Sequence, residues 1–376
     1  DTAQITLTVA VTTARPGPLP FHMRNAVRVR GDNASNNVFE DVYMYDCHVR
    51  INGNLPEYNA VQAALDVAQA GDTLQIAGLC AGSEERAGLW QVAYVNKTLT
   101  LKGGYSFDFA DWDPALYPTT LDAWGQGRVL FISENPGPVI TPTVEGLRLT
   151  GGDATGLRGA PSGRDAGGGV YVYRARAVLS DCLVYKNTAS TAGRGQGGGL
   201  YLASSAATLQ GNTIVSNTAS TAERGDGGGL YLASSAATLQ DNRVVHNTAS
   251  TARDGYGGGL YLDRSDATLA GNVVEGNVAS NAGNGYGGGL VLEWSDATLV
   301  DNAVQDNVAG TVDWSRGGGL YLSASDATLA GNMVQRNIAS TASGGEGGGL
   351  WLWLSHATLQ DNGIRGNTAS TADRKS

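Results

Sequence analysis

The triplet Gly-Gly-Gly recurs at a constant interval of 30 residues through the C-terminal half of the chain. The whole unit repeats with it, as GGGLYLxxSxATLxxNxVxxNxASTA, with no insertion or deletion up to Ala372. A strict period without slippage indicates that each repeat is one structural unit stacked on the next. The seven copies of the triplet begin at Gly167, Gly197, Gly227, Gly257, Gly287, Gly317 and Gly347.

Each unit contains three short segments in which residues alternate with the period of a β-strand. In the second unit these are 200–202, 207–209 and 214–215, and each is bounded by Gly, Ser, Asn or Asp. Nothing in the unit has a helical period, so equivalent strands of successive units must pair in parallel. The sequence therefore predicts an all-β fold, a right-handed parallel β-helix or solenoid with 30-residue coils of three strands and three turns.

Comparison of equivalent positions predicts which side chains face the interior. The positions of Leu200, Leu202 and Ile214 hold only aliphatic residues in every unit, so they should face inward. Asn217 recurs in every unit, and Asn212 recurs in all but the first, where Cys182 replaces it. A column of one amide type at a turn predicts a ladder of side chains, each hydrogen-bonded to the next.

The repeat divides the chain into four parts. Residues 167–376 form seven regular coils, and residues 73–166 are interpreted as irregular coils. Residues 21–72 should contain strands and an amphipathic helix over 57–70 that caps the solenoid. Residues 1–20 combine an alternating strand with a proline-rich spacer, the arrangement that strand donation to a neighbouring molecule requires. Folding back onto the same solenoid is the alternative. The strand would assemble through one apolar face, made of Ile5, Leu7, Val9 and Val11.

One column of aromatic residues lies between the inward positions, which predicts that it points outward. Exposed rings of this kind can stack on sugar rings or on another protein. The alternative is a self-packed aromatic column that stiffens the solenoid. The candidate binding residues are Tyr201, Tyr231, Tyr261, Trp294, Tyr321 and Trp351.

Acidic residues form two neighbouring columns at the turn after the first strand. Stacked carboxylates about 5 Å apart repel one another unless they are screened or bridged by a cation, so bound Ca²⁺ is one interpretation. The alternative is that each carboxylate accepts hydrogen bonds from its own turn. No other cofactor is predicted. The candidate metal ligands are Asp263, Asp266, Glu293, Asp296 and Asp326.

The charge of the chain limits its partners. The formal net charge is −10 and the pI is about 4.9, which argues against nucleic acid or an anionic membrane as a partner. No apolar run is long enough for a membrane-spanning helix. The chain begins at Asp1, which we interpret as a mature end after removal of a signal peptide. We therefore expect an extracellular or cell-surface location.

Several stretches of the chain resemble a known group of proteins. VQAALDVAQAGDTLQIAGLC, LTLKGGYS, TTLDAWGQGRVLFI and VEGLRLTGGDATG, followed by GGGVYV, resemble bacterial exported proteins with right-handed parallel β-helix repeats. The repeats are also similar to those of polymorphic outer-membrane adhesins. The resemblance covers roughly residues 47–372, and it implies secretion and a disulfide between Cys47 and Cys80. Its motifs are specific for the fold and not for a function.

Catalysis in a solenoid of this kind would need two carboxylates at a suitable separation, or acidic calcium ligands beside a basic residue. Such residues would interrupt the repeat at one place, whereas the strand positions continue unbroken and the four histidines are scattered. The sequence therefore predicts no catalytic residues and a protein that is not an enzyme.

These expectations favour a structural protein, a subunit of an extracellular fibre or surface layer. Solenoids would assemble with copies of themselves by end-to-end stacking, by donation of the N-terminal strand, or by both. Two alternatives stay open. One is a surface adhesin that binds a polysaccharide through the aromatic column, and the other is a polysaccharide lyase or hydrolase.

Overall fold

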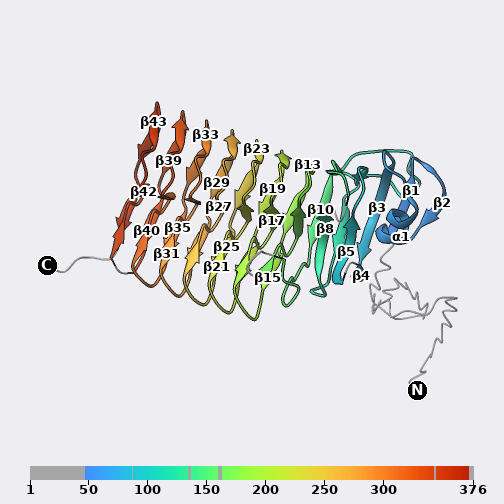
Figure 1. The fold of residues 1–376 in the computed structure, drawn as a ribbon, viewed down its shortest axis with the longest axis horizontal. Helices are drawn as coiled ribbons and strands as arrows, with labels where there is room; N and C mark the ends of the chain where they lie inside the picture. Colours follow the sequence, from blue (N-terminus) through green and yellow to red (C-terminus); the bar gives the residue numbers. More distant parts are fainter. Residues whose placement is uncertain (1–46, 87, 134–136, 160–162, 343, 372–376) are drawn as a thin grey trace, which may run out of the picture. The chain divides into compact units, whose positions relative to one another are not determined.

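The computed structural model describes residues 47–371, except 87, 134–136, 160–162 and 343. The described residues form a parallel β-helix in which successive coils lie side by side (Figure 1). This confirms the predicted fold class. The N-terminal strand and spacer expected in residues 1–20 lie outside the described residues, as do residues 21–46.

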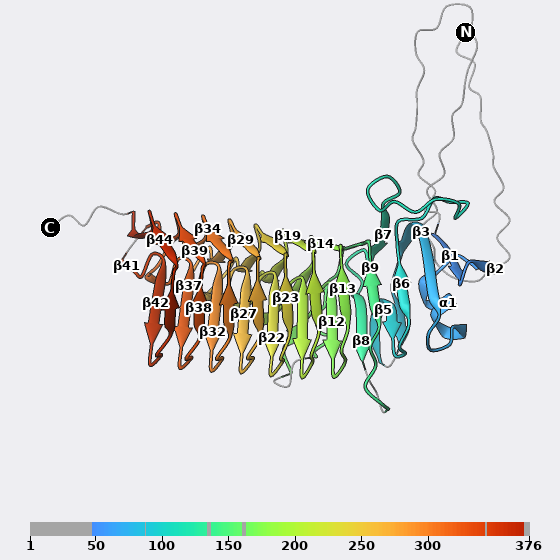
Figure 2. The ribbon, with the colours of Figure 1, turned by 90° about the horizontal axis from the view of Figure 1, so that it is seen from above.

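Each regular coil contains the three expected strands and two further short ones. β20 and its equivalents form a seven-stranded sheet, and so do β16 and its equivalents. Pairing keeps the 30-residue register of the sequence, so that Leu200 lies beside Leu230. Figure 2 shows the strands of successive coils side by side. In the second coil the strands are β16 (Gly195–Gln196), β17 (Leu200–Ala203), β18 (Thr208–Gln210), β19 (Thr213–Val215) and β20 (Thr218–Ser220).

The main core runs through the inside of the coils. Leu200, Leu202, Leu209 and Ile214 are almost completely buried there, as are their equivalents in the neighbouring coils. The predicted inward positions are therefore confirmed. Burial of these columns along the whole solenoid is the main favourable contribution to its folding.

Both asparagine columns form the predicted ladders. The Nδ2 of Asn217 donates to the Oδ1 of Asn247 in the next coil at 3.0 Å, and to the carbonyl of Val184 in the preceding coil at 2.9 Å. The backbone N–H of Asn217 donates to the same Oδ1 at 2.9 Å. Each buried amide thus satisfies its own polar atoms and those of the turn between two sheets.

The N-terminal end of the described solenoid is closed by a hairpin and a short helix. β1 (Cys47–Ile51) pairs antiparallel with β2 (Asn54–Tyr58) and with β3 (Thr73–Ala81). The helix α1 (Val61–Val67) packs against β5 (Leu89–Val95), β1 and β3. It is shorter than the expected 57–70, because β2 extends through Tyr58.

The apolar face of α1 covers the end of the core. Val61, Ala64 and Leu65 are buried and belong to the same apolar cluster as the interior of the coils. The helix therefore has the capping position that its amphipathic pattern predicted. Within the part of the chain that the structure describes, no helix is long and apolar enough to cross a membrane.

The irregular coils differ from the regular ones in their connections. Residues 103–118 form a long loop between β6 and β7, whereas only residues 123–127 join β7 to β8. In the second regular coil the equivalent connection is the much longer segment 216–229, which includes β20 and β21 (Gly225–Asp226). The strands of these coils are β5 (Leu89–Val95), β6 (Thr100–Lys102), β7 (Thr119–Asp122), β8 (Arg128–Ser133), β9 (Thr143–Glu145) and β10 (Leu147–Thr150).

The last described coil leaves its interior side chains open on one side. Leu352, Leu359 and Ile364 are 39%, 48% and 49% exposed, whereas the equivalent residues one coil earlier are at most 1% exposed. The strands of this coil are β42 (Leu350–Trp353), β43 (Thr358–Gln360), β44 (Gly363–Arg365) and β45 (Thr368–Ser370).

Candidate functional site

The aromatic column predicted to be exposed is buried along much of its length. Tyr201, Tyr231 and Tyr261 are 1%, 4% and 2% exposed. They lie in a second apolar cluster on the outer side of the sheet that contains β17, where Phe131 and Val291 also pack. The prediction that these three tyrosines form an exposed binding surface is therefore wrong, and the alternative of a self-packed column describes them correctly.

The two strands that the sequence did not predict explain this burial. The chain leaves β20, turns back through β21 and the Gly-Gly-Gly triplet, and covers the tyrosines from outside. The hydroxyl of Tyr231 donates to Oδ2 of Asp263 at 3.1 Å, and that of Tyr261 donates to Glu293. Burial is the main cause that raises the pKa of both tyrosines above the ordinary value, so both stay protonated.

The covering layer itself carries aromatic residues, and they continue the column outward. Tyr256, in β26 (Gly255–Tyr256), stacks on Tyr286, in β31 (Gly285–Tyr286), with ring centroids 4.4 Å apart. Tyr286 meets Tyr321 edge to face at 5.4 Å. Tyr321 stacks on Trp351 at 4.8 Å, and Trp351 on Trp353 at 5.8 Å. We call these five residues the outer aromatic strip.

The rings of this strip are only partly covered. Tyr256, Tyr286, Tyr321 and Trp351 are partly exposed, and Trp353 is 54% exposed. Two of the residues predicted for binding, Tyr321 and Trp351, thus belong to a partly exposed surface. Trp294 is exposed as well, but it lies in the turn after β32 (Leu290–Glu293). Among the described residues it has no ring contact with the strip.

Arginine–carboxylate pairs flank the strip at both ends. Nε of Arg224 donates to Asp226 at 2.7 Å while its guanidinium lies 3.8 Å from the centroid of Tyr256. Nε of Arg316 donates to Glu346 at 2.8 Å, and its guanidinium lies 5.0 Å from Trp351. This hydrogen bond raises the pKa of Arg316 and lowers that of Glu346. Arg316 and Glu346 are therefore charged and paired at neutral pH.

Tyr256 and Tyr286 were not predicted as binding residues, because their position varies from coil to coil. It holds Gln196, Asp226, Arg316 or Glu346 in other coils, so it does not stand out as an aromatic column. The two tyrosines are spaced by one coil, which is the signal that could have revealed their stacking.

The acidic columns do not assemble a metal site. No group of three or more His, Cys, Asp or Glu side chains suited to a metal ion occurs among the described residues. An oxygen of Asp266 accepts the backbone N–H of Asp296 at 2.9 Å, and Asp296 accepts that of Asp326 at 2.7 Å. Each carboxylate thus binds the turn of the next coil, not its own turn as the alternative proposed. Asp263 and Glu293 instead accept tyrosine hydroxyls, as described above.

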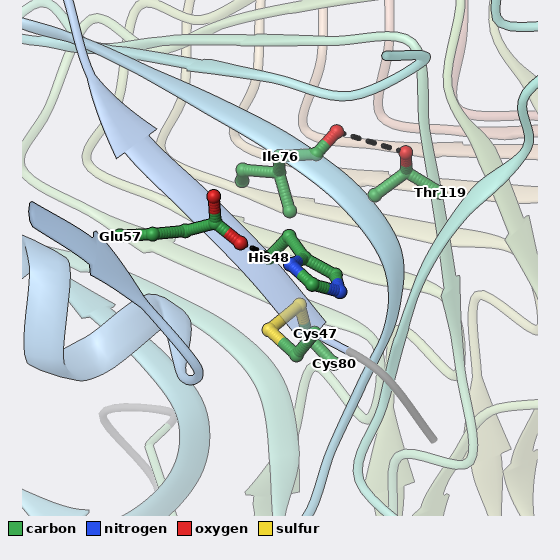
Figure 3. Close-up of a disulfide and its surroundings, with 6 residues drawn as sticks. All are labelled: Cys47, His48, Glu57, Ile76, Cys80 and Thr119. Carbon is green, nitrogen blue, oxygen red and sulfur yellow. Dashed lines mark hydrogen bonds and ion pairs between the residues drawn. A yellow bond between two sulfur atoms is a disulfide. The ribbon is translucent and has the colours of Figure 1, made fainter. Parts of the chain in front are cut away.

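The N-terminal hairpin is held by a disulfide and a charged cluster. Cys47 and Cys80 are joined, as the resemblance implies, with Cα atoms 4.5 Å apart (Figure 3). Beside them, Nδ1 of His48 contacts Oε1 of Glu57, and Nε of Arg50 donates to Oε2 of Glu57 at 3.1 Å. The hydrogen bond with His48 is the main cause that lowers the pKa of Glu57. The disulfide joins β1 to β3, and the contacts of Glu57 link β2 to β1.

A match to a family model assigns the chain to a protein family. The family model described as a right-handed β-helix region matches residues 145–334, and the chain belongs to this family. Among curated proteins, none matches this chain.

Solved structures with a similar arrangement include two of DFA-IIIase from Arthrobacter chlorophenolicus and one of the periplasmic alginate epimerase AlgG. Each is 11% identical to this chain. The matches to the two DFA-IIIase structures cover 79% and 80% of this chain and 89% of each DFA-IIIase chain, with TM-scores of 0.28 and 0.29. The third covers 78% of this chain and 85% of its own, with a TM-score of 0.21.

These solved structures are of enzymes, and they contradict the prediction that the chain is not an enzyme. That prediction treated an unbroken repeat as a sign of a purely structural role. An unbroken repeat by itself does not exclude catalysis.

Proposed function

We propose that the C-terminal coils bind a polysaccharide along the outer aromatic strip. The observation that carries this proposal is a continuous series of five aromatic rings, in contact from Tyr256 to Trp353, that stays partly exposed beside otherwise buried tyrosines. Aromatic rings stack on the C–H faces of sugars, and a row of them suits an extended chain of sugars.

The packing of the strip supports tight binding by a surface that is already ordered. Each ring is held by its neighbour and by a β-strand, so little side-chain entropy is lost when a ligand binds. The pair Arg316–Glu346 places donors and acceptors beside the rings without a net charge. Hydroxyl groups of a neutral polysaccharide can hydrogen-bond to such a pair.

Affinity electrophoresis tests this proposal, with the full chain run through gels that contain xylan, mixed-linkage β-glucan, galactomannan or alginate. We expect retardation by at least one polysaccharide, and loss of that retardation when Tyr286→Ala is combined with Trp351→Ala. Phe107→Ala is the matched control, because Phe107 is an exposed aromatic residue in the loop of the irregular coils. Unchanged migration of the wild-type chain in all four gels would reject the proposal.

A second candidate function is self-association through the last described coil. The exposed side chains of Leu352, Leu359 and Ile364 support it, because an exposed apolar face favours association. The opposite end is covered by α1, so two copies would meet through the same face with two-fold symmetry and form a closed dimer. Donation of the strand that contains Ile5, Leu7, Val9 and Val11 stays a prediction.

Sedimentation velocity on the 376-residue chain tests this second candidate. We expect a dimer, which Leu359→Asp combined with Ile364→Asp converts to a monomer. Val312→Asp is the control, because Val312 is equally exposed but lies in a loop away from the last coil. Deletion of residues 1–14 tests strand donation separately. A wild-type chain that sediments as a monomer at all concentrations would exclude both modes of association.

The disulfide bears on the compartment in which the chain works. Cys47–Cys80 would persist in an oxidising environment and be reduced in a cytosol. We therefore propose that the protein acts outside the cytoplasm, as the resemblance implied. Mass spectrometry of the secreted and cellular fractions after thiol blocking would test this location.

A further inference from the structure

The change from irregular to regular coils leaves a hollow on the side of the solenoid. Residues 123–127 join β7 to β8 directly, whereas the regular coils place an outer layer at this position. Where that layer is missing, a hollow of about 460 Å³ lies between Trp90, Gly125–Gly127 and the turn that contains Asp153, Thr155 and Leu157. This volume falls within the range of small-molecule sites.

The shape of the hollow depends on one glycine. Gly127 has a φ of +155°, and a Cβ atom there would lie 2.4 Å from the backbone oxygen of Trp90. The absence of a side chain lets the backbone pass close to β5 and leaves the indole of Trp90 46% exposed along one wall. The opposite wall combines an apolar side chain, Leu157, with the polar Asp153 and Thr155.

The polar wall is ordered before any ligand binds. One oxygen of Asp153, Oδ1, accepts the backbone N–H of Thr155 at 2.9 Å and also its hydroxyl. Thr155 in turn meets Thr191 of the next coil, with the two hydroxyl oxygens 3.0 Å apart. Among the described residues, the second carboxylate oxygen of Asp153 has no hydrogen-bond partner. It is therefore available to accept a hydroxyl group.

We infer that this hollow binds one neutral sugar ring, stacked on Trp90 with a hydroxyl group donated to Asp153. The site is separate from the outer aromatic strip and does not depend on it. An indole face, an apolar side chain and a fixed carboxylate form the combination that suits a pyranose, which has an apolar C–H face and a polar rim.

The charges around the hollow select against an acidic sugar. Glu85 pairs directly with Trp90 across the antiparallel strands β4 (Glu84–Arg86) and β5, so both side chains lie on the same face. Glu85 thus lies on the same face of the hairpin as the indole, and Asp153 lines the hollow together with Trp90. A uronic acid would bring a third negative charge into this position, which disfavours its binding.

Saturation-transfer NMR with the full chain tests the inference, using the methyl α-pyranosides of glucose, mannose and galactose and the methyl glycoside of glucuronic acid as probes. We expect at least one neutral glycoside to bind, with the strongest transfer to its ring C–H protons. The glucuronide should bind about tenfold more weakly. Trp90→Ala should weaken the neutral glycoside at least about tenfold, whereas Trp90→Phe should retain part of the affinity.

A charge variant and two controls complete the test. Asp153→Asn combined with Glu85→Gln should raise glucuronide affinity toward that of the neutral glycoside. Phe107→Ala, and the Tyr286→Ala/Trp351→Ala variant of the strip, should bind the neutral glycoside as the wild type does. The inference is overturned if no neutral glycoside binds or if a folded Trp90→Ala variant binds unchanged. Loss of polysaccharide binding at the strip would leave these results unaffected.

Discussion

Each buried asparagine of the ladders connects three successive coils. Asn247 accepts two hydrogen bonds at Oδ1 from Asn217, and its Nδ2 donates to the carbonyl of Ile214 at 2.9 Å and to Asn277 at 3.1 Å. No aliphatic residue of similar size can replace these contacts. The ladder is therefore a specific requirement of the turn, and not only a consequence of repetition.

Replacement of one ladder residue should cost far more than replacement of an exposed asparagine. Asn247→Ala removes the acceptor of the Asn217 backbone N–H and of one N–H of the Asn217 side-chain amide, both in a buried site, so we expect a loss of about 2–4 kcal/mol. The measurement is the midpoint of urea unfolding. Asn281→Ala is the control, because Asn281 is exposed, and it should shift the midpoint little. Equal effects of the two substitutions would contradict this role of the ladder.

Cys182 is a buried free thiol at the start of the other ladder. Burial raises its pKa from 9.0 to about 12, so the folded protein binds the thiol proton more tightly than the unfolded chain. Its contribution to stability should be complete below pH 9 and lost as the pH rises toward 12. At pH 8 we expect Ellman's reagent to react slowly with the native protein and quickly after denaturation. Rapid reaction of the native protein would refute the burial of this thiol.

The same position allows a stabilising substitution. The Sγ of Cys182 lies 3.5 Å from the carbonyl of Val144, where the regular ladder has an amide donor, and its backbone N–H already donates to Asn212 at 3.0 Å. Cys182→Asn should extend the ladder by one step and stabilise the fold by about 1 kcal/mol. A rise in the urea midpoint would support this expectation, and a fall would show that the site cannot hold the larger side chain.

At the scale of elements, the outer layer converts a surface column into a second core. The two short strands of this layer cover Tyr201 and its equivalents in the other coils. Successive rings of this column stack, and the ring centroids of Tyr201 and Tyr231 are 5.2 Å apart. Toward the C-terminal coils the layer carries Tyr256 and Tyr286, and there the aromatic surface becomes accessible. The same fold thus contains a stabilising and an exposed aromatic region.

A single substitution distinguishes the second core from a binding surface. Tyr201→Ala removes a ring packed between Tyr171 and Tyr231, so we expect a loss of about 3–5 kcal/mol. Trp294→Ala removes an exposed ring in a turn and should change stability by less than about 0.5 kcal/mol. Urea unfolding of both variants provides the comparison. A small effect of Tyr201→Ala would restore the original interpretation of an exposed column.

The sequence could predict strands in which apolar and polar residues alternate, but not short strands without this alternation. The positions of Leu200 and Ile214 and the asparagine ladders follow directly from identity at 30-residue intervals. β16 and β20 are too short and too polar to show alternation, so the covering layer was invisible and the direction of Tyr201 was misinterpreted as exposure. The hollow beside Trp90 depends on a loop that is missing from one coil, which only the stacked arrangement reveals.

At the scale of the whole molecule, each regular coil is stabilised by its two neighbours. The stability of such an array is close to a sum of coil terms and interface terms. The last described coil has one such interface, and its apolar side chains Leu359 and Ile364 are half exposed. The first described elements are instead joined by a disulfide and covered by α1. The two ends of the described solenoid therefore differ in stability.

This difference predicts a gradient in backbone hydrogen exchange along the 376-residue chain. Amides of β42–β45 should exchange fastest, because one lost interface is enough to open that coil, and protection should rise toward the middle coils. Reduction of Cys47–Cys80 should increase exchange in β1 and β3 without changing β42–β45. If Leu359 and Ile364 are buried in a dimer, dilution to the monomer should selectively raise exchange in the last coil. If backbone amides of all regular coils, including the last, are equally protected from exchange in a verified monomer, the solenoid opens only as a whole.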